Sequence, residues 1–318
     1  MVAFVDTNKH KVIYFMCMKC LVVVNAHSVR KKLLKKLDYI RERLSTRFEA
    51  VDIIFSERKG HIEELVKLNA TTYHSIIVCG GDGSLHEAVN GLLDVKSNCI
   101  LGIIPSGTVN DYARTLGLSK NLDVCLNAII DGNYEYTDLM LNNGELGVYV
   151  CGFGAFTSSS YETNQKDKKI IGKIAYVLNG IKQIFTVKNI PVEITIDDEK
   201  FEKNVGLVLA YNSKSVAGMP IDLLADITDG KLDVVIFYDK PGKKHVSFGS
   251  FIRMVKMFFC GVDSIKNGKH VLVKSIENIK ITSKQPLKIN MDGEKAESED
   301  INLKVLQKRL KIYAAKKW

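Results

Sequence analysis

Residues 78–86 read VCGGDGSLH, and this stretch decides the fold. An apolar run typical of a buried strand leads into the glycines, and the segment SLHEAVNGLL that follows has the spacing of a helix. A glycine turn between a strand and a helix N-terminus leaves backbone N–H groups available to an anion such as phosphate. Ser84 and Glu87 have the spacing of a capping box, so we expect the helix to begin directly behind Gly83.

Asp82 is the unexpected residue of this loop. A carboxylate about 4 Å from a phosphate oxygen is repelled by on the order of 4 kcal/mol at an effective dielectric of about 20. A magnesium ion or its water shell is therefore expected between Asp82 and the phosphate. The alternative is that Asp82 only shapes the turn and caps the helix, and the loop taken alone supports both interpretations equally.

A second loop, IPSGTVNDYAR at 104–114, follows the same plan of strand, turn and helix. Thr108 is the expected N-cap, with Asp111 three residues later. Asn110 and Asp111 are candidates to hold a nucleotide or the water shell of a metal, and Arg114 to balance charge on a transferring phosphoryl group. Alternatively, the Asn and Asp only occupy a first helical turn and Arg114 pairs with one of them.

The first half of the chain alternates apolar strands with helical patterns. A longer helix is expected around 29–45, and another from Leu122 to Ile130 that ends at Gly132. Strand patterns that each precede a helix lie at 20–25, 50–56, 75–79 and 99–105. Such a series predicts an α/β domain with a doubly wound, mostly parallel sheet, in which both loops lie at the carboxyl ends of strands, where ligands bind.

After residue 134 the period changes to that of strands joined by turns, such as those at Asn143-Gly144 and Asp292-Gly293. This half predicts a β-rich, sandwich-like domain with helical patterns near 171–185 and 247–259. We expect an N-terminal extension at 1–17, a nucleotide-binding domain at 18–138, a β-rich second domain at 139–300, and a C-terminal strand at 301–318 that returns to the first domain.

Charge and composition limit the partners. The net charge of +9 predicts an anionic partner: a nucleotide, a nucleic acid or an acidic membrane. Nucleic acid is the least supported, because no RNP-like motif or zinc-finger spacing is found. No apolar stretch reaches the roughly 18 residues of a membrane-spanning helix. Seven cysteines, mostly within apolar runs, are expected to be reduced core residues, which favours a cytoplasmic protein.

The segments GGDGSLHEAVNG and PSGTVNDYAR together resemble the catalytic domain of diacylglycerol kinases, of the soluble bacterial lipid kinase type that is also related to sphingosine and ceramide kinases. GGDG alone is shared with NAD kinases and phosphofructokinases, whose first domain has a similar fold. The chain departs from the family pattern at Ser84, where Thr is usual, at His86, where Asn is usual, and at 25–29, which lacks the usual Pro and Gly. The resemblance runs from about Met18 to the C-terminal strands.

The resemblance implies a kinase that uses ATP and Mg²⁺ to phosphorylate the hydroxyl of a lipid alcohol such as diacylglycerol. It implies a general base at Glu294 and catalytic roles for Asp82, Asp111 and Arg114. A structural magnesium would be held by backbone carbonyls of Asp226 and Lys231 and by the carboxylate of Asp229. The implied nucleotide contacts are Asn25, Ala26, His27, Ser28, Val29, Ser56, Gly80, Gly81, Asp82, Gly83, Ser84, Leu85, His86, Thr108 and Asn110.

Several alternatives stay open at this stage. The chain could be an NAD kinase-like or phosphofructokinase-like kinase of a soluble substrate, or a catalytically silent binding protein; a homodimer is also considered. The glycines of CGFGAF at 151–156 are expected to serve packing rather than a dinucleotide, because no helix pattern follows. Basic amphipathic patterns at 166–185 and 243–261 either face a membrane transiently or pack on the β-rich domain, and packing is favoured for the first.

Overall fold

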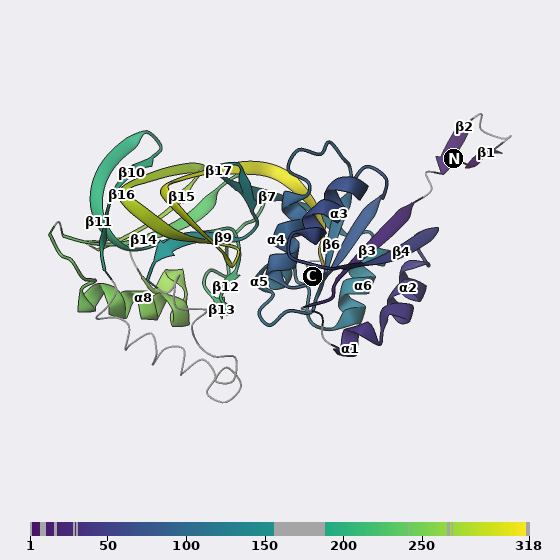
Figure 1. Ribbon diagram of the computed structural model, residues 1–318, viewed down its shortest axis with the longest axis horizontal. Coiled ribbons are helices and arrows are strands. Elements are labelled where there is room, and N and C mark those ends of the chain that lie inside the picture. Colours follow the sequence, from purple (N-terminus) through teal and green to yellow (C-terminus); the bar gives the residue numbers. More distant parts are fainter. Residues whose placement is uncertain are drawn as a thin grey trace. The chain divides into compact units, whose positions relative to one another are not determined.

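The computed structural model describes residues 2–6, 11–15, 18–27, 29, 31–155, 188–240, 242–265, 268 and 270–315. The chain forms two compact units (Figure 1). The first contains residues 1–136 and 310–318, and the second contains residues 137–309. No helix among the described residues is long and apolar enough to cross a membrane. Outside the two units' main sheets, β1 (Val2–Asp6) and β2 (Lys11–Phe15) pair only with each other.

The first unit is built on parallel strands in the order β4-β3-β5-β6. Their bounds are β3 (Lys19–Asn25), β4 (Ala50–Ser56), β5 (Ser75–Gly80) and β6 (Ile100–Pro105). Every residue of β5 and β6 is buried, as expected for central strands covered on both faces. The end of β17 (Glu294–Tyr313) joins this sheet, where Ile312 pairs with Leu101 in parallel.

Six helices follow these strands among the described residues: two after β3, one after β4, one after β5 and two after β6. They are α1 (Lys31–Leu34), α2 (Leu37–Leu44), α3 (His61–Asn69), α4 (Asp82–Asn90), α5 (Asp111–Thr115) and α6 (Leu122–Ile130). Helix α3 packs beside α4 and α2 beside α6, and in Figure 1 the two pairs lie on opposite sides of the strands. The helix expected around 29–45 is confirmed in part: the structure has α1 and the amphipathic α2 there, separated by a turn at Lys35 and Lys36. The helix at 122–130 is confirmed, and Gly132 adopts φ 73° just behind it.

The C-terminal segment is fixed within the first unit by specific bonds. The hydroxyls of Tyr313 and Ser75 are 2.7 Å apart and both are buried. The backbone N–H groups of Ala314 and Ala315 donate to the carbonyls of Asn133 and Leu116, at 3.0 Å each. These contacts hold the C-terminal segment against the ends of α5 and α6.

The second unit is an antiparallel sheet in the order β15-β14-β11-β10-β16-β17, with β9 pairing both β11 and β16, and β7 pairing β17 and β8. Its strands are β7 (Tyr134–Asn142), β8 (Glu145–Gly147), β9 (Val150–Gly154), β10 (Ile190–Ile196), β11 (Glu199–Tyr211), β12 (Ser215–Val216), β13 (Met219–Pro220), β14 (Leu232–Asp239), β15 (Val271–Ile276) and β16 (Asn278–Met291). Helix α8 (Phe248–Cys260) and the short η3 (Val262–Ser264) follow β14. The expected mixed α/β architecture with a β-rich C-terminal part is confirmed.

The glycines of strand β9 serve packing, as the sequence predicted. A Cβ on Gly152 would lie 2.3 Å from the carbonyl oxygen of Val208, and one on Gly154 would lie 2.3 Å from that of Gly206. The strand therefore approaches the backbone of β11 too closely for any side chain at these two positions. The predicted turn at Asn143-Gly144 is also confirmed, because both residues have positive φ, 49° and 92°.

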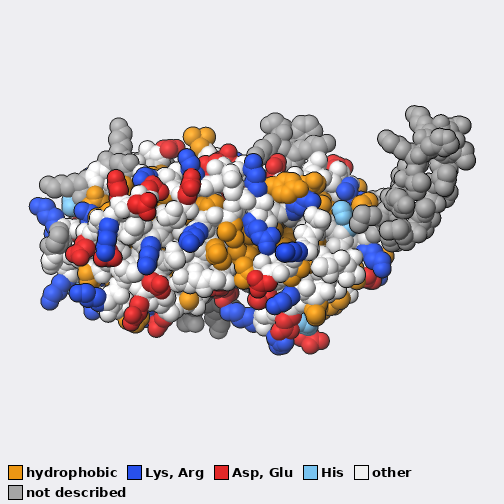
Figure 2. Space-filling view, turned by 90° about the horizontal axis from the view of Figure 1, so that it is seen from above, with side chains coloured by type: hydrophobic (Ala, Val, Ile, Leu, Met, Phe, Trp, Pro, Cys, Tyr) orange, Lys and Arg blue, Asp and Glu red, His pale blue; other side chains and the backbone are white. Residues whose placement is uncertain are grey.

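The surface of the molecule carries charges of both signs. On the face drawn in Figure 2, lysine and arginine side chains are interspersed with acidic side chains, and apolar side chains lie between them. The basic excess predicted from composition is thus spread over this face rather than gathered at one place on it.

Candidate active site

The two glycine loops of the first unit meet backbone to backbone. They follow β5 and β6, whose last residues, Gly80 and Pro105, are paired. A Cβ on Gly107 would lie 2.8 Å from the Cα of Gly81, so the loops could not approach this closely with a side chain there. The N–H of Ser106 also donates to the carbonyl of Gly80 at 2.8 Å. The sequence prediction that both loops lie side by side at the carboxyl ends of strands agrees with this geometry.

Asn110 closes the second loop. Its Oδ1 accepts from the N–H of Gly107 at 3.0 Å, and its Nδ2 donates to the carbonyl of Gly107 at 2.9 Å. Asn110 adopts the left-handed conformation, with φ 57° and ψ 55°, which asparagine tolerates better than most residues. The expected N-cap at Thr108 is wrong: α5 begins at Asp111 behind Asn110, and the carbonyl of Thr108 accepts from Nζ of Lys120 at 3.0 Å.

The expected capping box of Ser84 and Glu87 is also wrong. Helix α4 begins at Asp82, directly behind Gly81, so Ser84 lies inside its first turn. The hydroxyl of Ser84 accepts from Nδ2 of Asn25 at 2.8 Å, and the carboxylate of Glu87 accepts from the N–H of Ile62 at 3.3 Å. Both side chains therefore bind other segments, and no side-chain cap is formed at the start of α4.

Asp82 is the charged residue between the loops. Its Oδ1 accepts from the N–H of Tyr112 at 3.3 Å, so the carboxylate lies at the start of α5 rather than capping its own helix. Burial, and then the nearby Asp111 carboxylate, raise the pKa of Asp82 to about 6, against the opposing effect of backbone N–H groups of α5. The folded protein thus holds a carboxylate whose charge is poorly compensated, beside the glycine loop that the sequence predicts to bind an anion.

Asp111 and Arg114 lie on α5 next to this carboxylate. Asp111 is fully buried, and its Oδ1 lies 4.0 Å from Nη1 of the half-exposed Arg114. Nη2 of Arg114 also donates to the carbonyl of Val109 at 2.9 Å. The pairing suggested as the structural alternative for Arg114 is therefore present, and it leaves about half of the guanidinium side chain accessible to solvent.

The partly buried carboxylate of Asp82 and the buried one of Asp111 form a suitable donor pair for a divalent cation. Carboxylate oxygen is the ligand that Mg²⁺ prefers, and a cation would relieve the repulsion that Asp82 experiences from Asp111. No group of three or more His, Cys, Asp or Glu side chains with metal-site geometry occurs among the described residues.

The segment after β3 lies beside the first loop. Asn25 pairs in register with Ser56, which is buried at the end of β4. Oδ1 of Asn25 accepts from the N–H of His27 at 3.1 Å, and its carbonyl accepts from the N–H of Val29 at 3.0 Å. Nε2 of His27 lies 3.0 Å from the carbonyl of Glu57. Asn25 therefore joins this turn to Ser84 and the glycine loop.

Some of the residues implied as nucleotide contacts have buried side chains. Leu85 and His86 are buried in α4, with 1% and 5% exposure, so their side chains belong to the interior of the unit. Ala26 is exposed in the turn behind β3, and Ser28 lies outside the described residues. Among the implied contacts that the structure describes, Ala26, His27 and Thr108 are exposed, and Asn25 and the run from Gly81 to Gly83 at the start of α4 are partly exposed.

Ser106 is a residue that the sequence analysis missed. It is 7% exposed, and its hydroxyl has no hydrogen-bond partner within the part of the chain that the structure describes. Buried hydroxyls are usually paired, so this one is a candidate donor to a ligand of the glycine loops. The available signal was its position between Pro105 and Gly107 in a loop already expected to bind phosphate.

In the second unit, Glu294 lies at a hairpin tip held by Asp292. The Asp292 carboxylate accepts from the N–H groups of Val148, Tyr149 and Val150 at 2.6, 2.9 and 3.1 Å. Asp292 and Gly293 have φ 52° and 98°, which confirms the predicted turn. Glu294 is the first residue of β17 and is partly exposed. Asp292, taken from sequence as a turn residue only, is therefore an anchor that fixes the position of Glu294.

The turn at 226–231 is likewise held by a buried carboxylate that the sequence analysis missed. Asp138 is fully buried, and it accepts from the N–H groups of Gly230 and Lys308 at 2.6 and 2.7 Å. Oδ1 of Asp229 accepts from the N–H of Lys231 at 2.9 Å. Burial, and to a lesser degree Asp229 and Asp226, raise the pKa of Asp138. Asp138 therefore holds the turn through backbone hydrogen bonds, while Asp226 and Asp229 are exposed at it.

Family models match almost the whole chain. A model described as the diacylglycerol kinase catalytic domain matches residues 19–141. A second, described as the YegS C-terminal NAD kinase beta sandwich-like domain, matches residues 148–314. The two matched regions together contain both glycine loops, the turn at 226–231 and the hairpin that carries Glu294.

Individual proteins agree with these models. A diacylglycerol kinase of Bacillus subtilis (strain 168) is 31% identical over 222 residues, which cover 69% of this chain and 70% of that protein. A diacylglycerol kinase of Staphylococcus carnosus (strain TM300) is 28% identical over 246 residues, 77% of this chain and 78% of that one. A crystal structure of a diacylglycerol kinase from Bacillus anthracis (strain Sterne) superposes with a TM-score of 0.72 at 24% identity, over 93% and 96% of the two chains, and shows the same fold.

Proposed function

This chain belongs to the diacylglycerol kinase catalytic domain family, and on that premise we propose that it transfers the γ-phosphoryl group of ATP to the hydroxyl of a lipid alcohol, with Mg²⁺ as cofactor. Membership makes it a lipid kinase by class. Diacylglycerol is the first candidate substrate, because relatives that share two thirds of their length with this chain are named for it.

One observation carries the nucleotide part of this proposal. The glycine loops after β5 and β6 touch through Gly81 and Gly107, and Asp82 lies between them with its pKa raised to about 6. Backbone N–H groups at the start of α4 favour phosphate, and the carboxylate beside them is compatible with phosphate only when a cation lies between the two. Asp82, with Asp111, would hold this Mg²⁺, which when bound neutralises charge on the phosphates.

The chain's own residues supply the remaining tasks. The loop from Gly81 to Gly83 binds the phosphates through backbone N–H groups, and Arg114 balances charge on the transferring group. Glu294 accepts the proton of the lipid hydroxyl as its oxygen forms a bond to the γ-phosphorus and the bond to ADP breaks. Asp292 positions Glu294, because its three hydrogen bonds fix the hairpin that carries this residue.

Several finer features belong to the same proposal. The strand order β4-β3-β5-β6 supports a doubly wound first domain, with β3 and β5 at the switch point where ligands bind. A structural Mg²⁺ at Asp226, Asp229 and Lys231 is supported by the exposed carboxylates of Asp226 and Asp229 at that turn. We also propose the domain limits 18–138 and 139–300, a cytoplasmic location and transient contact with an anionic membrane, where the lipid substrate resides.

The test is a transfer assay with radiolabelled ATP against three kinds of acceptor. Diacylglycerol in mixed micelles is expected to yield a labelled product that partitions into the organic phase and requires Mg²⁺. Label transferred only to NAD⁺ or to a sugar phosphate would replace the proposal with a soluble-substrate kinase. No transfer to any acceptor, with ATP bound, would indicate a nucleotide-binding protein without kinase activity.

A further inference from the structure

Helix α8 of the second unit presents an apolar face to solvent. Its 13 residues bury Ser250, Phe251, Met254, Met257 and Phe258. Phe248, Ile252 and Phe259 point the other way and are 67%, 48% and 45% exposed. Their spacing of four and seven residues places them on one side of the helix. Exposed aromatic and aliphatic side chains gathered on one face indicate an interaction surface.

The exposed side of α8 is also basic. Arg253 and Lys256 are exposed beside the apolar residues, and Lys243 and Lys244 are exposed just before the helix. Residues 240–262 contain five lysines and arginines and no acidic residue: Lys240, Lys243, Lys244, Arg253 and Lys256. The surface therefore combines large apolar side chains with positive charge that no acidic residue of this segment offsets.

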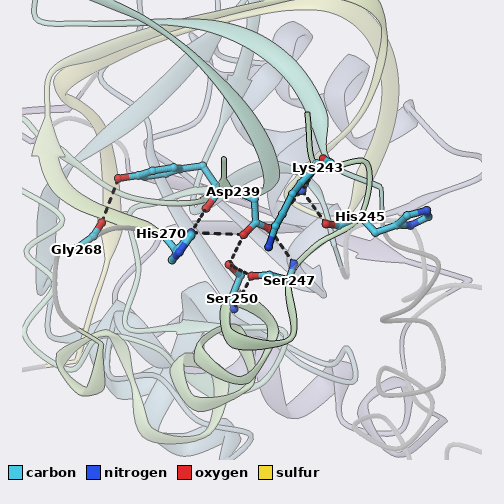
Figure 3. Close-up of polar contacts among 9 residues, drawn as sticks. Asp239, Lys243, His245, Ser247, Ser250, Gly268 and His270 are labelled. Carbon is cyan, nitrogen blue, oxygen red and sulfur yellow. Dashed lines mark hydrogen bonds and ion pairs between the residues drawn. The ribbon is translucent and has the colours of Figure 1, made fainter. Parts of the chain in front are cut away.

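A buried polar cluster holds α8 in this orientation (Figure 3). Asp239, 2% exposed at the end of β14, accepts from the N–H of Ser247 at 2.8 Å and from the hydroxyl of Ser250 at 3.2 Å. Nδ2 of Asn189 donates to the same carboxylate at 3.2 Å, and Nδ1 of His270 lies 3.4 Å from it. Ser247 is the N-cap of α8, so the cluster fixes the first turn of the helix.

This cluster is structural rather than catalytic. It contains Asp, His and Ser side chains, but both serines bond to Asp239 or to each other instead of to the imidazole of His270. A nucleophile would need the base as its partner. The function of the cluster is thus to anchor α8 with Phe248 outward at the helix start.

We propose that the outward face of α8, formed by Phe248, Ile252, Arg253, Lys256 and Phe259, docks on the surface of an anionic phospholipid bilayer. The helix is about 20 Å long and is too short to cross a bilayer, so it lies in the interface with its aromatic side chains among the acyl chains. Anionic head groups complement the basic residues. The proposal rests on the proposed function, because a kinase of a membrane lipid must reach its substrate at that surface.

Vesicle flotation tests this docking directly. The protein is mixed with phosphatidylcholine vesicles with or without phosphatidylglycerol, and the bound fraction is measured. Each basic residue near an anionic surface contributes roughly a five-fold change in partitioning. Arg253→Glu/Lys256→Glu is therefore expected to weaken binding to the anionic vesicles by about 25-fold or more. Phe248→Ser/Ile252→Ser/Phe259→Ser is expected to weaken it to a similar or greater degree.

A matched control comes from α3 of the first unit. Lys67 and Leu68 are both exposed there, Leu68 by 75%. Lys67→Glu/Leu68→Ser changes the same kinds of residue on another helix and is expected to leave binding unchanged. Equal binding of the wild-type protein and both α8 variants would overturn the proposal, provided that melting curves show all variants folded. Equal loss in the α3 control would also overturn it, since the effect would then follow net charge alone.

Cys260 offers a second readout at the end of the same helix. It is exposed, whereas the other described cysteines, Cys20, Cys79, Cys99, Cys125 and Cys151, are buried. In a Cys17→Ser background, a polarity-sensitive fluorophore on Cys260 is expected to shift to shorter wavelength with anionic vesicles only. An unchanged spectrum while the protein floats with vesicles would place the contact elsewhere and overturn the assignment to α8.

Two further measurements separate this inference from its alternatives. Kinase activity toward a short-chain diacylglycerol in detergent micelles should survive in the α8 variants, while activity on vesicles falls. If no lipid is phosphorylated, the proposed function fails, but flotation still decides the docking. If the free protein is a dimer that the α8 variants convert to monomers, the face is a protein interface and the membrane proposal is wrong.

Discussion

The carboxylate of Asp82 accepts a hydrogen bond of 3.3 Å from the N–H of Tyr112, and this contact joins the two glycine loops of the first unit. Asp82 stands at the first residue of α4, and Tyr112 is the second residue of α5. The carboxylate that the proposed function assigns to Mg²⁺ is therefore held in part by the helix that follows the other loop.

Asp82→Asn should stabilise the ligand-free protein. The folded pKa of Asp82, about 6, lies above the ordinary value of 3.8 for an aspartate, so the folded state binds this proton more tightly than the unfolded state does. The stability that protonation gives is lost as pH rises toward and through 6. Asparagine removes that loss while keeping an acceptor for Tyr112. In EDTA, the variant should melt at a higher temperature than wild type at pH 8, by a margin that shrinks at pH 5; a lower melting temperature at pH 8 would contradict the assigned environment.

Gly107→Ala should separate the two loops. The added Cβ would meet the Cα of Gly81 and Oδ1 of Asn110, both at 2.8 Å, and backbone cannot move aside as a side chain can. We expect a loss of about 1–3 kcal/mol in the free energy of unfolding and weaker ATP binding by calorimetry. Gly249→Ala is the control: it lies in α8 with nothing within 4 Å of an added Cβ and should be neutral or slightly stabilising. Full ATP affinity in Gly107→Ala would show that the close approach is dispensable.

Asp292→Ala and Glu294→Gln should have different effects on stability, although the two residues lie only two positions apart. Removing the Asp292 carboxylate leaves the N–H groups of Val148, Tyr149 and Val150 without their acceptor, at a cost of about 2–5 kcal/mol in urea unfolding. Glu294→Gln alters a partly exposed residue and should leave stability within about 0.5 kcal/mol. If Asp292→Ala unfolds at the wild-type urea concentration, Asp292 is only a turn residue and not the anchor of the hairpin.

Ser106→Ala and Ser75→Ala form a contrasting pair of buried serines. The Ser106 hydroxyl has no partner, so its removal should leave the ligand-free protein equally stable or more stable by up to about 1 kcal/mol. Ser75→Ala leaves the buried hydroxyl of Tyr313 without its 2.7 Å partner and should destabilise by about 1–3 kcal/mol. If Ser106 donates to a phosphate, ATP should raise the melting temperature of Ser106→Ala less than that of wild type. An equal rise would remove Ser106 from the nucleotide site.

Periodicity predicted most of the regular structure. The strand expected at 50–56 is β4, and the helix expected from Leu122 to Ile130 is α6, since both have strong local patterns. The helix expected around 29–45 is interrupted at Lys35 and Lys36, because the amphipathic pattern alone does not mark the turn before Leu37. Local patterns therefore predict where an element lies better than where it is interrupted.

The site was predictable in its parts but not in its connections. The two loops and Asp82 follow from glycine spacing and charge, whereas the capping patterns of Ser84 and Thr108 were wrong. Ser84 binds Asn25, 59 positions away in sequence, and such partners compete with local caps. The anchoring roles of Asp138 and Asp292 were not predicted for the same reason, because their partners Gly230 and Val148 lie 92 and 144 positions away.

The most direct test of the central claim is phosphoryl transfer from radiolabelled ATP to diacylglycerol in mixed micelles. Wild type is compared with Asp82→Asn, Glu294→Gln and the surface control Lys67→Glu/Leu68→Ser. The account predicts an organic-phase product from wild type and the control, and at least about 100-fold lower rates in the other two, both folded. An undiminished rate in Asp82→Asn and Glu294→Gln, or no product from wild type with any lipid alcohol, would contradict it.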